Sequence, residues 1–209
     1  MPIKLILFAL VAVIQLAIPA WMIVGHERVL NEGEVFKFRT APVDPRDPFR
    51  GEYVYLEFDA EQGKWPLPQE MKEGSGAQHA YALLGTDSAG FARIDALVPE
   101  KPSGAPYLAI QYMSWTPDTL FGINLPFDRF YLEEGDGKKT EELLAPQWSE
   151  GFVSQPLPAY AEVRILDGEA VIQDLIVGDK SIYEWLKEEP KNIPQATTPA
   201  DTISVRAGS

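Results

Sequence analysis

The sequence predicts a mainly β (β-rich α+β) fold, in which a single N-terminal transmembrane helix precedes a partly closed β-barrel or sandwich-like domain with one or two short helices. Three observations lead to this prediction. The chain opens with a long apolar stretch, continues in short alternating runs separated by Gly, Pro, Asn and Asp, and shows helical spacing only in brief segments. We therefore expect an anchor at 1–25, a β-rich domain at 26–189 and a disordered tail at 190–209, which is polar and rich in Pro, Thr and Ala.

The apolar N-terminal stretch is long enough for a membrane span. Between Leu5 and Gly25 there is no charged residue, and Gln15 is the only strongly polar side chain. About 20 apolar residues carry a helix across the hydrocarbon layer, whereas the apolar core of a cleavable signal peptide spans only about 7 to 15. Ala20 could be the last residue before a cut, but the apolar run continues through Val24. We therefore expect an uncleaved signal-anchor, with a removed signal peptide as the alternative.

Charge and cysteine content limit the partners of the domain. The formal net charge is −13, and no cluster of Lys and Arg interrupts that background, so nucleic acid and anionic lipid surfaces are repelled. There is no cysteine, which excludes disulfide scaffolds, thiolate nucleophiles and cysteine zinc sites. Lys4 precedes the apolar stretch, and a short N-terminal tail before a large domain favours export of the C-terminal part.

Several strands follow from the alternation of apolar and polar residues. In the run 52–58, Val54, Leu56 and Phe58 share one face, and the two tyrosines Tyr53 and Tyr55 share the other. In the run 107–113, the side chains at 108, 110 and 112 are expected to face inward. The complete set of expected strands is 35–39, 52–58, 79–84, 91–98, 107–113, 127–133, 161–166 and 169–177.

Turn and helix signals are clearest late in the chain. The dipeptide Asp167-Gly168 suits the positive φ angles of a tight hairpin turn between the last two expected strands. Ser181 and Glu184 have the spacing of a capping box, which predicts a short helix from Ser181 onward. Pro190 ends this helix, and a second short helix is expected over 140–145.

The segment 42–58 is a rigid, charged run that leads into an aromatic strand. Prolines at every third position favour a polyproline II path, which places Asp44, Asp47 and Arg50 on one face. Asp44 and Asp47 are then roughly 9 Å apart, too far to share one proton. The run forms either a binding ridge or an ordered loop in which the Asp and Arg side chains cap backbone groups and each other.

The residues from Arg50 to Phe58 also resemble the motif of the GDYXXLXY family of bacterial membrane-anchored proteins. Gly51, Tyr53 and Leu56 match the motif, while Glu52 stands for its Asp and Phe58 for its final Tyr. The later run 124–134 is similar to the family as well. The resemblance implies a protein of the bacterial cytoplasmic (inner) membrane, single-pass, with an extracytoplasmic or periplasmic domain. Family members are often encoded beside multi-pass membrane proteins, and their activity is not established.

A second charged run, 127–133, mixes charged and aromatic side chains in a strand-like pattern, and cross-strand ion pairing on a solvated face is its expected use. Strand alternation places Arg129, Tyr131 and Glu133 on one side. If this strand lies beside the strand 52–58, then Arg129 or Glu134 meets Asp44 and Asp47. The expected binding residues are Asp44, Arg46, Asp47, Arg50, Gly51, Glu52, Tyr53, Asp128, Arg129, Tyr131 and Glu134.

The sequence favours a binding function over catalysis. His26 and His79 have no ligand-spaced partner, so we expect neither a metal nor a cofactor, and no G-x-S-x-G motif is present. We expect an accessory module of the bacterial envelope that docks an integral membrane partner, such as a multi-pass protein, or an envelope component through 42–58. The alternative is a hydrolase-like enzyme that uses Asp44, Asp47 or Glu134 as acid or base with Arg46 and Arg50. A purely structural envelope protein is the third possibility.

Overall fold

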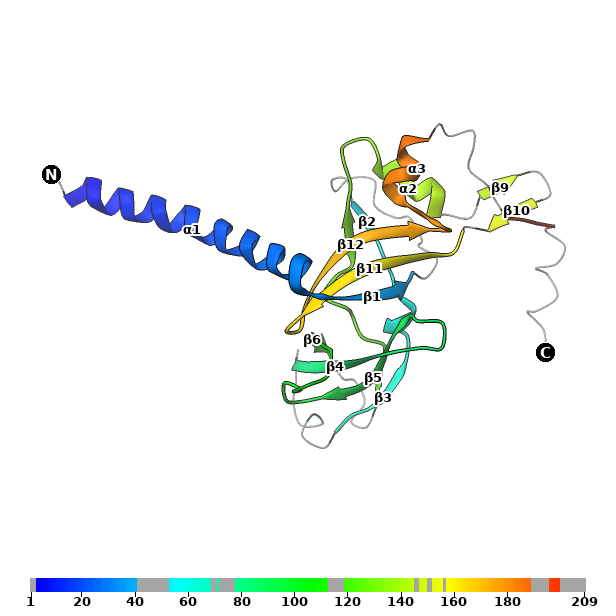
Figure 1. Cartoon of the computed structure of the whole chain (residues 1–209), viewed down its shortest axis with the longest axis horizontal. Coiled ribbons are helices and arrows are strands. Elements are labelled where there is room, and N and C mark those ends of the chain that lie inside the picture. Colours follow the sequence, from blue (N-terminus) through cyan, green and yellow to red (C-terminus); the bar gives the residue numbers. More distant parts are fainter. Residues whose placement is uncertain are drawn as a thin grey trace.

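One long helix projects from a β-rich domain in the computed structural model of the chain (Figure 1). The structure describes residues 3–40, 53–68, 71, 78–112, 119–144, 147–149, 152–155, 157–188 and 196–199. The helices are α1 (Ile3–Glu32), α2 (Gly137–Leu144) and α3 (Ile182–Lys187), with a 3-10 turn, η1, at Asp59–Glu61. The mainly β prediction is confirmed, and the sheets are arranged as an open sandwich because none of those described closes into a barrel.

Five small sheets contain the described strands. The first has the order β1 (Glu34–Arg39), β11 (Ala159–Leu166), β12 (Glu169–Val177) and β13 (Lys180–Ser181), and the second has the order β5 (Ala92–Val98), β4 (Gln78–Thr86) and β6 (Tyr107–Tyr112). The remaining sheets are β2 (Tyr53–Tyr55) with β8 (Arg129–Tyr131), β3 (Lys64–Pro66) with β7 (Thr119–Phe121), and β14 (Ala196–Pro199) with β10 (Phe152–Gln155) and β9 (Gln147–Ser149).

The β11–β12 hairpin forms the centre of the first sheet. Asp167 and Gly168 have φ angles of 54° and 89°, so the expected tight turn with two positive φ angles is confirmed. A Cβ at Gly168 would lie 2.6 Å from Cε2 of Tyr107. Glycine is therefore required both by the backbone conformation and by the close packing of the turn against β6.

Helix α1 is attached directly to this sheet. Val29 is buried at 3% exposure, and the helix ends where the amide of Gly33 donates to the carbonyl of Val29 at 2.9 Å. Arg164 of β11 donates from Nη1 to the carbonyl of Gly33 at 3.0 Å. Length and composition make α1 the one helix among the described residues able to cross a membrane, and the domain buries none of its apolar stretch. The helix therefore leaves the domain without a linker.

The β4–β5 hairpin is fixed by a carboxylate in its turn. Asp87 accepts hydrogen bonds from the amides of Ala89 at 2.8 Å and Phe91 at 2.9 Å, and Arg39 of β1 donates to its other oxygen at 3.0 Å. The bond from the Phe91 amide is the main reason that the pKa of Asp87 is lowered. The hairpin predicted around 86–90 is confirmed, and its turn also contacts the first sheet.

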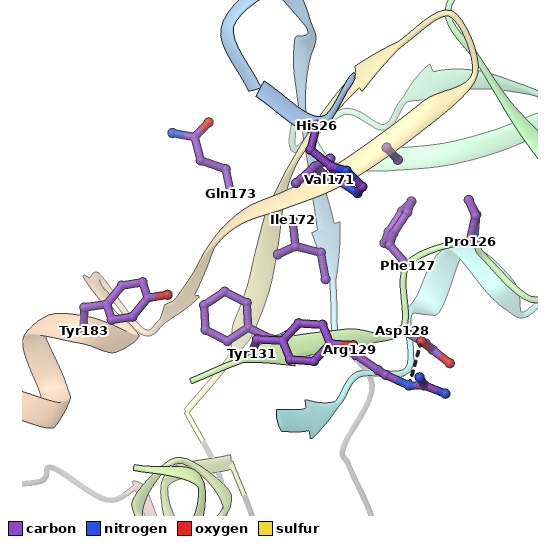
Figure 2. Close-up of a pocket in the computed structure, with 12 residues that line it drawn as sticks. His26, Pro126, Phe127, Asp128, Arg129, Tyr131, Val171, Ile172, Gln173 and Tyr183 are labelled. Atoms are coloured by element: carbon purple, nitrogen blue, oxygen red, sulfur yellow. Dashed lines mark ion pairs between the residues drawn. The ribbon is translucent and has the colours of Figure 1, made fainter. Parts of the chain in front are cut away.

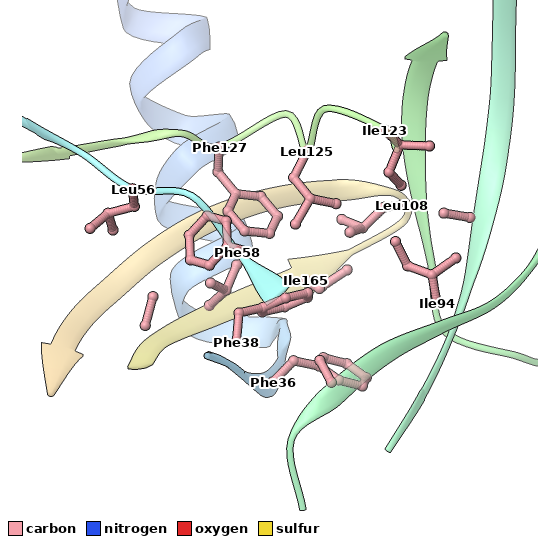
Figure 3. Packing of buried hydrophobic residues seen from close by; sticks show 14 of the residues in the cluster. Phe36, Phe38, Leu56, Phe58, Ile94, Leu108, Ile123, Leu125, Phe127 and Ile165 are labelled. Atoms are coloured by element: carbon pink, nitrogen blue, oxygen red, sulfur yellow. The ribbon is translucent and has the colours of Figure 1, made fainter. Parts of the chain in front are cut away.

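The core lies between the sheets and contains the inner faces predicted from alternation (Figure 3). Val54, Leu56 and Phe58 are 2%, 2% and 0% exposed, which confirms the inner face of the motif strand. The side chains at 108, 110 and 112 are also buried, as expected. Phe58 meets Phe38 and Phe127 edge-on, with ring centroids 5.8 and 5.3 Å apart.

Several boundaries differ from the prediction. The strand expected at 127–133 is only β8, because Phe127 turns into the core before the strand begins. Helix α2 begins three residues earlier than predicted, where the buried Thr140 bonds to the carbonyl of Asp136 at 3.0 Å. Ser181 caps α3 as expected. Its side chain accepts from the amide of Tyr183, two residues on, whereas a capping box would use the amide of Glu184. Within the expected tail the described residues form β14, and the division into anchor, domain and tail stays a prediction.

Candidate functional site

The motif strand β2 pairs with β8, so the condition stated for these two runs in the sequence is met. The antiparallel register places Tyr53 opposite Tyr131 and Tyr55 opposite Arg129. The amide of Leu56 also donates to the carbonyl of Asp128 at 2.8 Å, which continues the pairing past the end of β2. Because side chains alternate along a strand, burial of Val54 and Phe130 on the inner face leaves the paired tyrosines and Arg129 on the outer face.

Tyr53, Tyr55, Arg129 and Tyr131 form one group, which we call the tyrosine–arginine cluster. The ring centroid of Tyr53 lies 5.2 Å from that of Tyr55 and 5.8 Å from that of Tyr131. The guanidinium carbon of Arg129 lies 5.5 and 5.3 Å from the ring centroids of Tyr53 and Tyr55. Tyr55 is 40% exposed and Tyr131 is 67% exposed, so the cluster is presented to the surface.

The environment of Arg129 stabilises its positive charge. Hydrogen bonding to Tyr55 and then to Tyr131 raises the pKa of Arg129, with a smaller contribution from the carboxylate of Asp128. The Arg129 Nε atom lies 3.6 Å from an oxygen of Asp128. Contacts of a guanidinium with the faces of aromatic rings are weakly attractive at exposed positions. The cluster therefore holds a cation at the surface in a restricted position.

A cavity of about 500 Å³ adjoins the cluster (Figure 2). Its walls come from α1, the segment 126–131, β12 and α3, and its polar lining residues are His26, Asp128, Arg129, Tyr131, Gln173 and Tyr183. The ring of Tyr183 lies 5.8 Å from that of Phe130. Burial, followed by the charges of Asp174 and Glu133, raises the pKa of Tyr183. The cavity therefore has mixed polar and aromatic walls near the C-terminal end of α1.

Glu61 holds the end of the motif in place. Its two carboxylate oxygens accept from the amides of Phe58 at 2.9 Å and Leu125 at 2.8 Å. Burial is the main reason that the pKa of Glu61 is raised, and these two hydrogen bonds act in the opposite direction. The side chain thus joins η1 to the segment that leads into β8, and it acts as a structural bridge beneath the site.

The structure gathers part of the predicted site. Tyr53, Asp128, Arg129 and Tyr131 lie together, whereas Glu134 is exposed in the turn before α2. The other predicted residues, Asp44, Arg46, Asp47, Arg50, Gly51 and Glu52, lie outside the described residues. The hydrolase-like alternative therefore stays a prediction. In the part of the chain that the structure describes, no three His, Asp or Glu side chains gather closely enough to hold a metal ion.

Sequence reasoning did not identify three further residues of this region. Tyr55 belongs to the cluster, and its exposed position in the motif strand was a signal that pointed to it. Gln173 and Tyr183 line the cavity, and no local pattern marks them, because β12 and α3 reach the site only through the tertiary fold.

A comparison with protein-family models connects this geometry to a family. The model described as GDYXXLXY protein matches residues 15–175, which include the C-terminal part of α1, both strands of the cluster and most of β12. Comparisons with curated proteins and with solved structures gave no match. Because the match covers well over half of the 209 residues, the chain belongs to the GDYXXLXY family.

Proposed function

We propose that this protein is a membrane-anchored accessory module that docks an integral membrane partner. Its domain stands on the extracytoplasmic side of the bacterial cytoplasmic membrane, and the docking surface consists of the tyrosine–arginine cluster together with the charged segment 42–52. The observation that carries the proposal is that the two faces of the motif strand have different surroundings. Val54, Leu56 and Phe58 on one face belong to the core, and the tyrosines on the other face lie at the surface beside the guanidinium of Arg129.

The attachment of α1 supports permanent anchoring. The helix runs without a break from Ile3 to Glu32, so the possible cleavage point after Ala20 lies inside it. Its C-terminal end is packed on the first sheet through Val29 and Gly33. A domain held in this way stays within reach of other membrane proteins, and its orientation relative to the bilayer is restricted.

The composition of the cluster suits protein recognition. Tyr and Arg are enriched among the residues that dominate binding energy at protein interfaces, because they combine a large contact area with directed polar groups. Arg129 also offers several N–H donors in a planar arrangement that matches a carboxylate. The cluster presents Tyr55, Tyr131 and Arg129 to the solvent beside the half-buried Tyr53, and partner binding is a use that fits this arrangement.

The test is recovery of partners from native membranes with the full-length protein in mild detergent. Arg129→Ser is expected to reduce the amount of co-purified membrane protein by roughly tenfold, the equivalent of about 1.4 kcal/mol. Arg93→Ser is a matched control, because Arg93 is an exposed arginine that pairs with Asp95 at 2.7 Å on β5. Simultaneous reversal of charge at Asp44 and Asp47 should also weaken the complex while the domain stays folded.

Equal recovery of the partner by folded Arg129→Ser and Arg93→Ser proteins would contradict the assignment of the docking surface to the cluster. Undiminished recovery by the Asp44 and Asp47 double variant would remove the segment 42–52 from that surface. If the wild-type chain is recovered alone even after cross-linking, the docking function itself is wrong.

A further inference from the structure

Strand β12 has an open edge near the C-terminal end of α1. On one side β12 pairs with β11 from Glu169 to Val177, with a register shift that leaves Gln173 unpaired in this ladder, and on the other side β13 pairs only with Ile176 and Val177. Within the described residues, the part of β12 from 169 to 175 therefore has no strand neighbour on that second side. An open strand edge presents backbone groups that can pair with another chain.

The hairpin register shows which residues face this edge. A two-residue hairpin loop is closed by a hydrogen-bonded pair, here Leu166 and Glu169, and hydrogen-bonded and non-hydrogen-bonded pairs then alternate along the ladder. Ala170 and Ile172 belong to the non-hydrogen-bonded pairs, so their N–H and C=O groups point away from β11. These two residues provide the backbone groups that an added strand requires.

Two adjoining cavities follow the same edge, and we call them together the β12 groove. The cavity of about 500 Å³ beside the cluster contacts Ala170, Val171, Ile172 and Gln173 in succession. Successive side chains of a strand point to opposite faces, so a cavity that touches four consecutive residues lies along the edge and not over one face. Figure 2 shows Val171 beside His26 on one side of β12 and Ile172 directed toward Tyr131 on the other.

The second cavity, of about 450 Å³, extends the groove to the membrane helix. It shares His26, Pro126, Ala170 and Val171 with the first cavity. Its remaining lining includes Trp21 and Met22, which are 82% and 58% exposed near the end of the apolar stretch of α1. The groove is therefore apolar where it meets the bilayer and polar at its far end, near Arg129 and Tyr183.

We propose that the partner adds an extended segment, the one directly following one of its transmembrane helices, as a strand along the open edge of β12. This inference rests on the docking function proposed above and specifies which part of the partner binds. A chain that leaves the bilayer beside α1 enters the apolar end of the β12 groove first, and its backbone then reaches Ala170 and Ile172. Such strand addition combines backbone hydrogen bonds with pockets for alternate side chains.

The charges at the far end of the groove specify the partner segment further. Asp174 and Glu133 act on Tyr183 there, and the protein as a whole carries a net charge of −13. Arg129 lines the same end, so the segment should carry a basic side chain near Asp174 and Glu133 and an acidic side chain near Arg129. The expected binding segment is therefore apolar at its start, extended, and charged where it passes Arg129 and Tyr183.

Photo-cross-linking in native membranes tests this placement with the full-length chain. A photoreactive phenylalanine analogue replaces Gln173, which is exposed in the groove, or Gln111, which is exposed on β6 and serves as the matched control. The expected adduct forms from position 173 only, and mass spectrometry maps it to partner residues just after a membrane span. An adduct with a phospholipid, or with a partner region remote from any span, would overturn the proposal.

A backbone variant tests the strand itself. Ala170→Pro removes one N–H from the open edge while leaving the β11 ladder intact, and Ala170→Ser keeps the N–H as a control. Ala170→Pro should reduce the adduct from position 173 and the recovered partner by roughly tenfold relative to Ala170→Ser. If Ala170→Pro lowers the melting temperature, its lower recovery no longer tests the strand edge alone. The partner residues that cross-link to position 173 in the chain with Ala170 unchanged then decide whether a strand is added.

The outcomes separate this inference from the docking function. Loss of the partner with Arg129→Ser, together with full recovery by folded Ala170→Pro, leaves docking in place and rejects strand addition. Failure of the wild-type chain to recover any membrane protein rejects both.

Discussion

The two faces of the family motif differ in what they contribute to the molecule. On the inner face, Val54, Leu56 and Phe58 are almost completely buried. On the outer face, Tyr55 is 40% exposed, and Tyr131 of β8, which lies opposite Tyr53, is 67% exposed. The same short strand therefore carries both a folding signal and a surface signal, and the two can be altered separately.

The inner face connects elements that are distant in the sequence. The ring centroid of Phe38, from β1, lies 5.1 Å from that of Phe127, which precedes β8. Both rings also contact the ring of Phe58. A bridge between Thr40 and Phe58 brings the motif strand beside β1. Burial of one such aromatic side chain stabilises a fold by about 1.5–3 kcal/mol before packing effects are added. This side of the motif should dominate stability.

The largest expected effect is therefore the loss of the inner aromatic ring. Phe58→Ala removes a side chain with 0% exposure and its edge-on contacts with Phe38 and Phe127. We expect the free energy of unfolding to fall by about 3–5 kcal/mol, because the cavity cannot collapse fully. Urea denaturation of the detergent-solubilised protein, followed by tryptophan fluorescence, measures this change. A loss below about 1 kcal/mol would show that the motif is not central to the core.

The next effect concerns the carboxylate below the motif. Glu61→Ala leaves the amides of Phe58 and Leu125 without their acceptors. A fully buried unsatisfied donor costs about 1–3 kcal/mol, and both of these bonds are only part-buried, so we expect a total loss of about 1–3 kcal/mol, smaller than for Phe58→Ala. The same denaturation experiment measures it, with the exposed Glu57→Ala as the control. Equal stability of the two variants would mean that water replaces both acceptors.

The titration of Glu61 should make stability depend on pH. Burial raises the pKa of Glu61 in the folded state, so this group favours folding below its unfolded pKa of about 4.3, and the contribution is lost as the pH rises through the folded pKa. Between those two values the folded state binds more protons than the unfolded state. Glu61→Gln, which does not titrate, should lack this decline in a series of denaturation curves from acid to neutral pH. The same decline in Glu61→Gln would assign it to another group.

The local pattern was sufficient to predict the inner face and both hairpins. Alternation in 52–58 specified which side chains are buried, and Asp167-Gly168 specified a turn that needs two positive φ angles. These features depend on neighbours in the sequence. By contrast, β3 and β7 were not predicted, because each has three residues and their pairing joins Trp65 to Leu120 across a long stretch of chain.

The candidate site was predictable only in part for the same reason. The sequence marked Tyr53, Arg129 and Tyr131 as candidates, but the pairing of their strands was a conditional expectation until the register was known. The β12 groove was not foreseen. Its walls include α1, the segment 126–131, β12 and α3, and only the tertiary fold places His26 beside Val171.

The smallest effect on stability should come from the outer face, where binding is expected to change instead. Tyr131→Ser removes an exposed ring, and surface substitutions of this kind usually change the free energy of unfolding by no more than about 0.5 kcal/mol. The loss of a central aromatic residue from an interface commonly costs about 2 kcal/mol or more, so partner recovery should fall by well over tenfold. Denaturation and co-purification of the same variant give the two numbers. A large loss of stability with unchanged recovery would reverse the roles assigned to the two faces, because the outer tyrosines would then serve the fold and the partner would bind elsewhere.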